Sequence, residues 1–379
     1  MRIGVFTYGI EGQRMTGIAR YAVELTRALR RVEPDLEIVL LNPYPESDHA
    51  WYREFPTYPL PLLRTLPMAA TLGNWQLHRA ASELELDVLH DPCGIAPFLM
   101  PKQRYLRVTT VHDAIPALYP ETQPLLTRLV FQTLVRASAR TADAVLTVSQ
   151  ASADDLHRVY GLPRSTLHAI PNGVTRPEPQ LPQDVAAALE RLGVERPYYL
   201  YVGALHPRKN LARVCEAFAR VRATHPETRL VIVGPPSWGA HETLRGVLEQ
   251  ARSESGVTFT GFVSDDDLAV LYRGALALVF PSLYEGFGLP ALEAMSHGTP
   301  VVTSNVSSLP EVVGEAALLV DPTIVEAIAD AMARLVVDEP LRARLADAGR
   351  RRAAGFTWED TARRTLDVFR AGCHESPGP

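Results

Sequence analysis

The sequence has few cysteines and no long apolar run. Its three cysteines, Cys93, Cys215 and Cys373, lack the spacing of a metal site, and an odd number cannot all pair within one chain. This usage is typical of a reducing compartment. No run reaches the roughly 18 apolar residues that a membrane-spanning helix needs. Because residues 1–8 read as the start of a strand and not as a secretory signal, we expect a cytoplasmic protein.

Basic residues do not outnumber acidic ones. The chain has 38 Lys and Arg against 43 Asp and Glu, which gives a formal net charge of −5. A protein that binds nucleic acid normally carries a net positive field, so this balance argues against nucleic acid as a partner. Only two of the basic residues are lysines, Lys102 and Lys209. Lysine is a compact, strongly hydrated cation, so in such an arginine-rich chain each lysine is a weak candidate for a specific role.

Strand patterns alternate with helix patterns through both halves of the 379 residues, which are enough for two domains. This alternation predicts an α/β fold with two parallel, doubly wound, Rossmann-like sheets. We expect a first domain at 1–175, a proline-rich linker and domain entry at 174–195, a second domain at 176–357 and a tail after Ala371. The predicted strands are 3–8, 36–41, 87–90, 106–111 and 144–148 in the first half, and 198–203, 230–234, 257–260, 275–280 and 299–303 in the second.

The most informative stretch, residues 280–298, reads as a strand end, a glycine loop and a short helix. Gly286 and Gly288 allow a ligand to approach the backbone closely, and Pro290 suits the first turn of a helix. The unpaired N–H groups at such a helix start favour negative charge. This stretch therefore predicts a phosphate site.

Two glutamates flank the same loop. Glu285 comes just before it, and Glu293 lies about 7 Å along the helix axis if the helix begins near Gly288. A carboxylate beside a phosphate is repelled unless it has another partner, and sugar hydroxyls are suitable donors. Such a pair by itself is more often a surface glutamate and a helix glutamate without a ligand. The neighbouring glycines and proline favour a nucleotide sugar, which has hydroxyls on both sides of a diphosphate.

Arg208 and Lys209 lie in the loop between the predicted strand 198–203 and the next helix. A basic pair at a helix start can simply be solvated, although the helix dipole makes cations mildly unfavourable there. The mismatch indicates a bound anion, and an arginine fork beside a lysine suits a diphosphate. Asp265, Asp266 and Asp267 suggest a metal site, but the preceding Ser264 makes a helix cap the better interpretation, so we expect no metal.

Polar residues also follow the strand 106–111. His112 is a candidate to donate a hydrogen bond to a sugar or to charge at the reaction centre, and Asp113 to orient it or to cap the next segment. Gly9, Gly12 and Gly17 do not form a dinucleotide-binding fingerprint. The segment 43–76 is rich in proline and aromatic residues. Packing on its own domain is the favoured interpretation, and binding of an acceptor or of a membrane surface stays open.

The stretch 280–298 closely resembles the signature of retaining glycosyltransferases of family 4, in which two glutamates are separated by seven residues. The matching positions are Glu285, Phe287, Gly288, Leu289 and Glu293. The resemblance covers nearly the whole chain and implies the GT-B architecture, two Rossmann-like domains that face a central cleft. It implies that Glu285 contacts the donor sugar, that the loop amides meet sugar and phosphate, and that Glu293 holds the ribose.

The resemblance extends to other site residues. It implies that Gly17 lets its loop approach donor and acceptor, that His112 is a site residue, and that the helix at 358–371 packs back on the first domain. We also expect the backbone near Val263 to face the base. The family often has arginine directly after the glycine of the 198–203 strand, where this chain has Ala204. Phosphate binding would then depend on Arg208 and Lys209.

The resemblance implies a retaining, metal-independent hexosyltransferase that uses a nucleotide-diphosphate sugar as co-substrate and has no other cofactor. Elements such as Pro207-Arg208-Lys209-Asn210 look most like bacterial mannosyltransferases that build surface polysaccharides from GDP-mannose. The expected acceptor is a glycan or a lipid-linked glycan, with a peripheral contact to the inner membrane face left open. A nucleotide-sugar epimerase of the same architecture and a non-catalytic nucleotide-sugar-binding protein are the alternatives.

Overall fold

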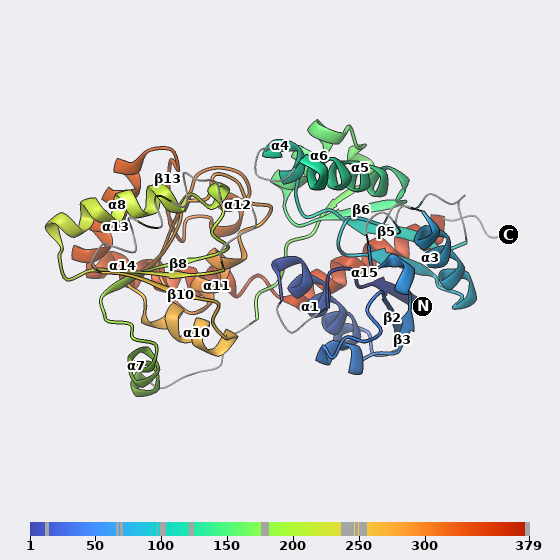
Figure 1. Cartoon of the computed structure of the whole chain (residues 1–379), viewed down its shortest axis with the longest axis horizontal. Helices are drawn as coiled ribbons and strands as arrows, with labels where there is room; N and C mark the ends of the chain where they lie inside the picture. The colour runs from blue at the N-terminus through green and yellow to red at the C-terminus, as the bar shows by residue number, and fades with distance from the viewer. Residues whose placement is uncertain are drawn as a thin grey trace. The chain divides into compact units, whose positions relative to one another are not determined.

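The computed structural model describes residues 1–11, 15–65, 68, 71–96, 98, 104–120, 125–175, 182–235, 246, 249 and 256–375. The chain forms two compact units (Figure 1). Unit 1 consists of Met1–Gly173 and Thr357–Pro379, and unit 2 of Val174–Phe356. Each unit has a parallel sheet with helices packed on it, which confirms the predicted α/β class.

Unit 1 contains a seven-stranded sheet in the order β3-β2-β1-β4-β5-β6-β7. All neighbouring strands are parallel, so their carboxyl ends lie at one edge. The five strands predicted in this half are confirmed, and the short edge strands β3 and β7 are additional. The strands are β1 (Arg2–Phe6), β2 (Glu37–Asn42), β3 (Thr57–Pro59), β4 (Val88–Asp91), β5 (Leu106–Thr110), β6 (Ala144–Thr147) and β7 (Leu167–Ala169).

Two helices of unit 1 begin at residues whose side chains cap them. Thr16 Oγ1 accepts a hydrogen bond from the N–H of Ala19 at 3.2 Å, and Ser149 Oγ accepts one from Ser152 at 3.0 Å. The helical segments are α1 (Gly17–Val32), α3 (Leu72–Glu83), α4 (Ile115–Leu118), α5 (Leu125–Thr141), α6 (Gln150–Tyr160) and α15 (Trp358–Glu375), with short 3₁₀ turns η1 (Ala50–Arg53), η2 (Pro61–Leu63) and η4 (Arg164–Thr166).

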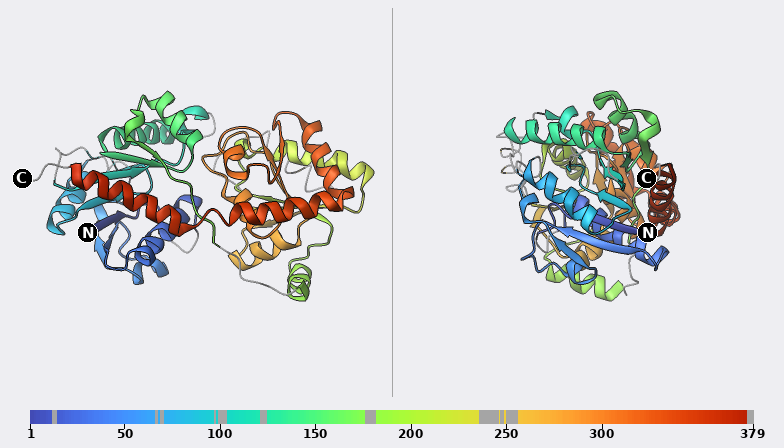
Figure 2. Two further views of the ribbon diagram at one scale, coloured as in Figure 1. Left: turned by 180° about the vertical axis from the view of Figure 1, so that it is seen from behind. Right: turned by 90° about the vertical axis from the view of Figure 1, so that its right-hand side faces the viewer.

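Helix α15 packs on α1 (Figure 2), with the rings of Tyr21 and Trp358 6.3 Å apart and an ion pair of 2.9 Å between Arg31 and Glu359. It runs to Glu375, so the expected tail after residue 371 is wrong. The helix continues because no proline interrupts it before Pro377.

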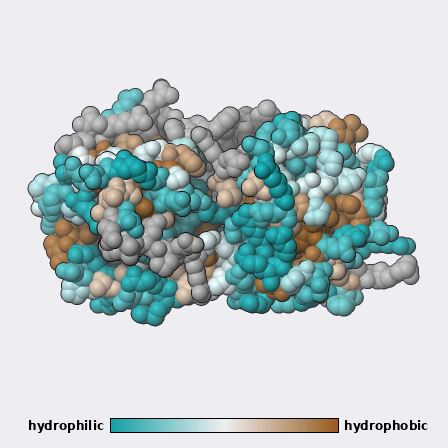
Figure 3. Space-filling model, turned by 90° about the horizontal axis from the view of Figure 1, so that it is seen from below, coloured by the Kyte–Doolittle hydropathy of each residue, from teal (hydrophilic) through white to brown (hydrophobic). Residues whose placement is uncertain are grey.

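The segment 43–76 packs largely on unit 1. Trp51 is fully buried, Phe55 is 6% exposed, and the hydroxyl of Tyr52 donates to the carbonyl oxygen of Ile10 at 2.8 Å. Among the described residues of this segment, three large hydrophobic side chains are exposed: Leu62, Leu72 and Trp75. Elsewhere the surface seen from below is mostly hydrophilic, with small separate hydrophobic patches (Figure 3). No helix within the described ranges is long and apolar enough to cross a bilayer.

Unit 2 contains a six-stranded parallel sheet in the order β10-β9-β8-β11-β12-β13. The chain winds outward from β8 in one direction and from β11 in the other, so the switch point of the topology lies between these two strands. Ligands of doubly wound sheets bind beyond the carboxyl ends of the strands at such a point. The strands are β8 (Tyr198–Val202), β9 (Arg229–Val233), β10 (Val257–Gly261), β11 (Ala277–Phe280), β12 (Val301–Ser304) and β13 (Leu318–Val320).

Helices cover both faces of this sheet, and one apolar core includes Tyr199, Phe218 and Met332, all fully buried. The helical segments are α7 (Pro182–Arg191), η5 (Pro207–Lys209), α8 (Leu211–Thr224), α10 (Asp265–Gly274), α11 (Leu289–Ser296), α12 (Leu309–Val313), α13 (Val325–Val337) and α14 (Glu339–Ala353). The sequence also predicts a helix from the end of β9 to about Ser253, and most of these residues lie outside the described ranges.

Two expectations about unit 2 have clear outcomes. The linker assignment for 174–195 is wrong in part, because α7 lies within it and buries Val185 and Leu189. These residues are four apart on one helix face, a signal hidden by the surrounding prolines. The capping interpretation is confirmed, since Ser264 Oγ accepts a hydrogen bond of 3.1 Å from the N–H of Asp267 in the first turn of α10.

Candidate active site

The loop after β8 is held in place by Asn210, which is 2% exposed and has a left-handed backbone with φ of 62°. Its side-chain amide donates to the carbonyl oxygens of Pro281 at 2.9 Å and Pro322 at 2.7 Å. His206 Nδ1 accepts a hydrogen bond of 3.2 Å from the N–H of Arg208. A non-glycine residue in the left-handed region is strained, and such strain clusters at functional sites. Asn210 thus ties the β8 loop to the loops after β11 and β13.

This arrangement brings Arg208, Lys209 and Glu285 together. Lys209 Nζ lies 2.7 Å and Arg208 Nη1 lies 3.1 Å from Glu285 Oε1. The three side chains are only 12%, 14% and 9% exposed, in the order Arg208, Lys209, Glu285. Lys209 Nζ also lies 4.7 Å from the ring centroid of Phe280. The sequence pointed to each residue separately, with the cations on a diphosphate and the acid on a sugar, and did not reveal that they pair.

The carboxyl group of Glu285 is ionised in this cluster. Burial alone raises its pKa, but the charges of Lys209 and Arg208 outweigh that effect and leave the pKa below its usual value. Two cations against one carboxylate leave the cluster with a net positive charge. The cluster can therefore bind an anion.

Serines after β12 hold the backbone of the Glu285 loop. Ser307 Oγ accepts a hydrogen bond of 3.1 Å from the N–H of Glu285. Ser308 is fully buried, and its Oγ lies 2.9 Å from the carbonyl oxygens of both Glu285 and Phe287. Sequence reasoning missed these residues, and their only signal was a serine pair directly after a predicted strand.

Gly288 caps α11 with φ of 103°, and a Cβ at this position would lie 2.6 Å from Leu309 Cδ2. Only glycine fits both constraints. Within the described ranges, the backbone N–H groups of Phe287, Gly288 and Leu289 donate no hydrogen bond. Because the ring of Phe287 is buried and lies 6.0 Å from that of Phe356, only its backbone can meet a ligand. The loop thus supplies free amides at a helix start, next to the positive cluster.

Glu293 is half-buried and is held by Tyr272 of α10, whose hydroxyl donates to Glu293 Oε2 at 3.0 Å. Tyr272 is 1% exposed, and its ring is stacked on that of His297 with 5.4 Å between centroids. Burial lowers the pKa of His297 to about 4, so this imidazole is neutral at pH 7. Sequence reasoning also missed Tyr272, because nothing in the sequence relates α10 to α11.

Val263 lies in the loop between β10 and α10, half-buried beside the exposed Phe262. Its strand is two positions from β8, roughly 10 Å away at the usual strand spacing, and the two strands end at the same edge of the sheet. Among the described residues, no hydrogen bond joins Val263 to the loop around Glu285, and its expected position near a base stays a prediction.

In unit 1, His112 follows β5, and its Nε2 lies 2.8 Å from the carbonyl oxygen of Pro92. A carbonyl only accepts, so Nε2 carries the proton. Burial lowers the pKa of His112 to about 4, more than this hydrogen bond raises it, so the ring is neutral at pH 7. In this arrangement the remaining ring nitrogen, Nδ1, is an acceptor, and the expectation that His112 donates to a sugar stays a prediction.

The neighbours of His112 have structural roles. Tyr21 of α1 meets the imidazole edge to face, with 4.8 Å between ring centroids. Asp113 Oδ1 accepts a hydrogen bond of 2.9 Å from the N–H of Ile115, so it caps the next segment, which was one of its two expected roles. Gly17 is the first residue of α1 and is exposed.

Comparison with known proteins shows which family the chain resembles. The model of Glycosyltransferase Family 4 matches residues 15–176, and that of Glycosyl transferases group 1 matches residues 187–352. O-antigen chain mannosyltransferase B of Escherichia coli is 30% identical over 368 residues, which cover 94% of this chain and 96% of that protein. The chain belongs to the glycosyltransferase family that these two models and this relative represent.

Other relatives agree with this assignment. The glycosyltransferase is also 30% identical over 417 residues to MMP alpha-(1->4)-mannosyltransferase of Mycolicibacterium hassiacum, with 97% and 98% of the two chains covered. Among solved structures, Anabaena HepE in complex with UDP-glucose superimposes with a TM-score of 0.77 at 20% identity, covering 98% of this chain and all of that one. Sucrose-phosphate synthase from Thermosynechococcus elongatus gives 0.77 at 24% identity, with 98% of each chain covered. At such identities the structures support the GT-B fold alone.

Proposed function

We propose that this glycosyltransferase moves mannose from GDP-mannose to a hydroxyl group of a glycan or lipid-linked glycan, with retention of the anomeric configuration. The name of the Escherichia coli relative, an O-antigen chain mannosyltransferase, supports both the sugar and the polymer. HepE, which shares the fold, binds UDP-glucose, so a nucleoside diphosphate sugar suits this architecture. The observation that carries the proposal is the buried cluster of Arg208, Lys209 and Glu285 next to the free amides at Gly288.

In the proposed reaction the bond between the anomeric carbon and the diphosphate breaks, and negative charge grows on the leaving diphosphate. Arg208, Lys209 and the start of α11 stabilise that charge more strongly in the transition state than in the bound donor. These two cations and the helix start meet the need for positive charge, and we propose that no metal takes part. The acceptor oxygen forms the new bond on the face that the diphosphate leaves, and the proton of the acceptor hydroxyl passes to an oxygen of the departing diphosphate.

The remaining residues have proposed roles in holding the donor. Ionised Glu285 accepts hydrogen bonds from sugar hydroxyls, and its charge stabilises the cationic anomeric carbon. Glu293 binds the ribose hydroxyls, with its carboxylate fixed by Tyr272. The backbone near Val263 faces the base, and Gly17 allows its loop to approach the substrates. Neutral His112 accepts a hydrogen bond from a sugar hydroxyl through Nδ1.

For location, we propose that unit 1 makes a peripheral contact with the inner membrane face. Exposed Leu62, Leu72 and Trp75 support this proposal, and the guanidinium of Arg79 lies 5.4 Å from the ring centroid of Trp75. Aromatic and basic side chains of this kind favour an anionic membrane surface. Co-sedimentation with vesicles of phosphatidylglycerol tests it, and binding unchanged in Trp75→Ser would contradict it.

A thermal-shift panel of GDP, UDP and ADP tests the donor class. A nucleotide at a hundred times its dissociation constant adds about 2.7 kcal/mol to the free energy of unfolding. Transfer of labelled mannose from GDP-mannose to a mannosylated acceptor, with the anomeric configuration read by NMR, then tests the reaction. Stabilisation by no nucleotide would reject a nucleotide-sugar enzyme. Donor conversion without an acceptor would indicate an epimerase.

A further inference from the structure

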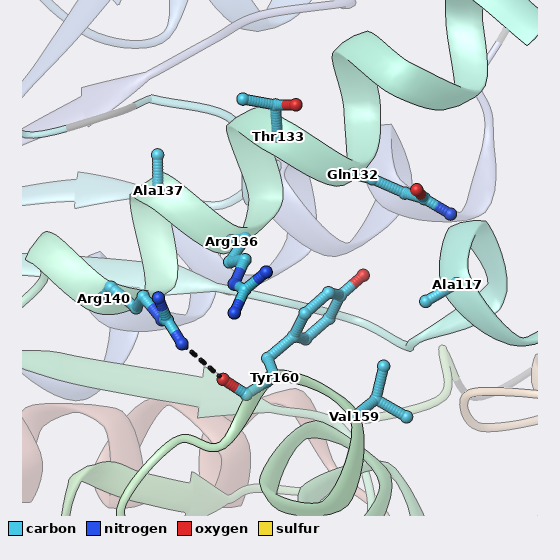
Figure 4. A pocket seen from close by; sticks show the side chains of 8 residues that line it. All are labelled: Ala117, Gln132, Thr133, Arg136, Ala137, Arg140, Val159 and Tyr160. Carbon is cyan, nitrogen blue, oxygen red and sulfur yellow. Dashed lines mark hydrogen bonds between the residues drawn. The ribbon is translucent and has the colours of Figure 1, made fainter.

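A separate concave site lies in unit 1, where α4, α5 and α6 meet. The cavity has a volume of about 650 Å³ (Figure 4). Its lining includes Ala117 of α4, Gln132, Arg136 and Arg140 of α5, and Tyr160 of α6. Binding sites for small ligands usually measure about 300 to 1,000 Å³, so the cavity is large enough for a sugar-sized molecule.

The α5 wall of this cavity is positive. Gln132, Arg136 and Arg140 are spaced four residues apart and therefore lie on one face of the helix. Helix α5 contains no Asp or Glu, and no carboxylate is among the described residues that line the cavity. Arg140 is in the last turn, where the helix dipole favours a cation without any ligand. Arg136 lies one turn earlier and makes no ion pair within the part of the chain that the structure describes.

The opposite wall presents a buried hydroxyl. Tyr160 is 5% exposed, and its oxygen has no hydrogen-bond partner among the described residues. Leaving such a group unsatisfied costs about 1 to 3 kcal/mol, so it indicates a bound molecule or water. Burial, together with the nearby charge of Asp113, raises the pKa of Tyr160 to about 12, so the hydroxyl is a donor at neutral pH. Figure 4 shows the phenol ring beside Arg136, with Arg140 donating to the backbone oxygen of Tyr160.

We propose that this cavity is a binding site for a phosphate monoester, with Arg136 and Tyr160 as the principal donors. Terminal phosphate oxygens accept several hydrogen bonds at once and match the planar fork of an arginine. The volume leaves room for a sugar attached to the phosphate. We assign the phosphate to the acceptor or its carrier, and this assignment rests on the glycosyl transfer proposed above. The binding of an anion in the cavity does not depend on that function.

Isothermal titration with inorganic phosphate and mannose 6-phosphate tests the site, with mannose as the uncharged control. We expect mannose 6-phosphate to bind and mannose not to bind. Arg136→Ala removes an exposed side chain without opening the core and should weaken binding of mannose 6-phosphate about tenfold or more, as expected for loss of a charged hydrogen bond. Tyr160→Phe should weaken it several-fold, and Arg136→Lys should restore part of the loss.

The matched control is Arg220→Ala, which removes an exposed arginine of α8 that pairs with Glu326. It should bind mannose 6-phosphate as the unchanged chain does. Binding of mannose 6-phosphate that survives Arg136→Ala would belong to cations elsewhere, such as Arg208, and would overturn the proposal. The proposal would also fail if the protein bound neither inorganic phosphate, nor mannose 6-phosphate, nor the vesicles. Vesicles of phosphatidic acid in phosphatidylcholine form the lipid arm, and Arg136-dependent binding to them alone would assign the phosphate to a lipid. These experiments measure binding and no sugar transfer, so their result would stand even if the proposed enzymatic function were refuted.

Discussion

Replacing Tyr272 with phenylalanine removes one hydroxyl from the contact between α10 and α11. That hydroxyl donates to Glu293 Oε2 at 3.0 Å, from a side chain that is 1% exposed. A hydrogen bond to a charged group contributes about 1.5 to 3 kcal/mol when it is buried. Because Glu293 is half-buried, we use the lower end of that range. Free rotation of the carboxylate should then cost the ribose contact about 1.4 kcal/mol, or about tenfold in affinity.

Isothermal titration with GDP and with its 2′,3′-dideoxy analogue separates this effect from a general loss of stability. The Tyr272→Phe variant should bind GDP about tenfold more weakly, and it should bind the dideoxy analogue as the unchanged protein does. Tyr199→Phe is the matched control, since Tyr199 is fully buried in unit 2 and its hydroxyl donates to the carbonyl oxygen of Met332 at 2.8 Å. It should lose stability but not affinity. Equal losses for both nucleotides, or no loss for either, would refute the role given to Tyr272.

Three further predictions concern Glu285, Ser308 and His78. Glu285→Gln should reduce transfer at least about a hundredfold, yet bind the nucleoside diphosphate no more weakly, because it frees Arg208 and Lys209 from their carboxylate; weaker binding in titrations would contradict this. Ser308→Ala removes a hydroxyl whose single proton is donated to one of two nearby buried carbonyl oxygens, those of Glu285 and Phe287. It should lower the free energy of unfolding by about 1 to 3 kcal/mol in urea titrations, and a change within error would count against it. Burial lowers the pKa of His78 to about 4, so between pH 6.5 and pH 4 the unfolded chain binds a proton that the folded chain does not. The free energy of unfolding should therefore fall as the pH is lowered from 6.5 to 4. In urea titrations a His78→Gln variant should show a smaller fall over this range.

Local chemistry made most of the fold predictable. The strands of a parallel sheet are buried on both faces, so β8, β9 and β11 appear as continuous apolar runs. Capping made the starts of α6 and α10 readable from Ser149 and Ser264. Helix α7 was missed because it contributes only a few apolar residues and lies among prolines, where composition suggests a linker.

The site was predictable only where one short stretch carries the chemistry. The loop from Glu285 to Gly288 could be read because strand, glycines and helix follow each other directly in the sequence. The contact between Tyr272 and Glu293 spans 21 residues, and that between Ser308 and the carbonyl oxygen of Glu285 spans 23. Such contacts arise from the order of the strands, which no local pattern encodes. The same holds for His112, whose acceptor nitrogen follows from a carbonyl oxygen 20 residues away.

The pairing of Glu285 with both cations changes how the site must work. A diphosphate that approached Arg208 and Lys209 would compete with a carboxylate only 2.7 Å from the lysine nitrogen. Were Glu285 to leave the cluster, it would have to find new donors, because a buried carboxylate without partners is strongly destabilising. The hydroxyls of a sugar are such donors, and a free nucleotide lacks them. In the proposed reaction, the pairing would therefore favour the complete donor over the released diphosphate at Glu285. It would also link recognition of the sugar to the availability of positive charge for the leaving group.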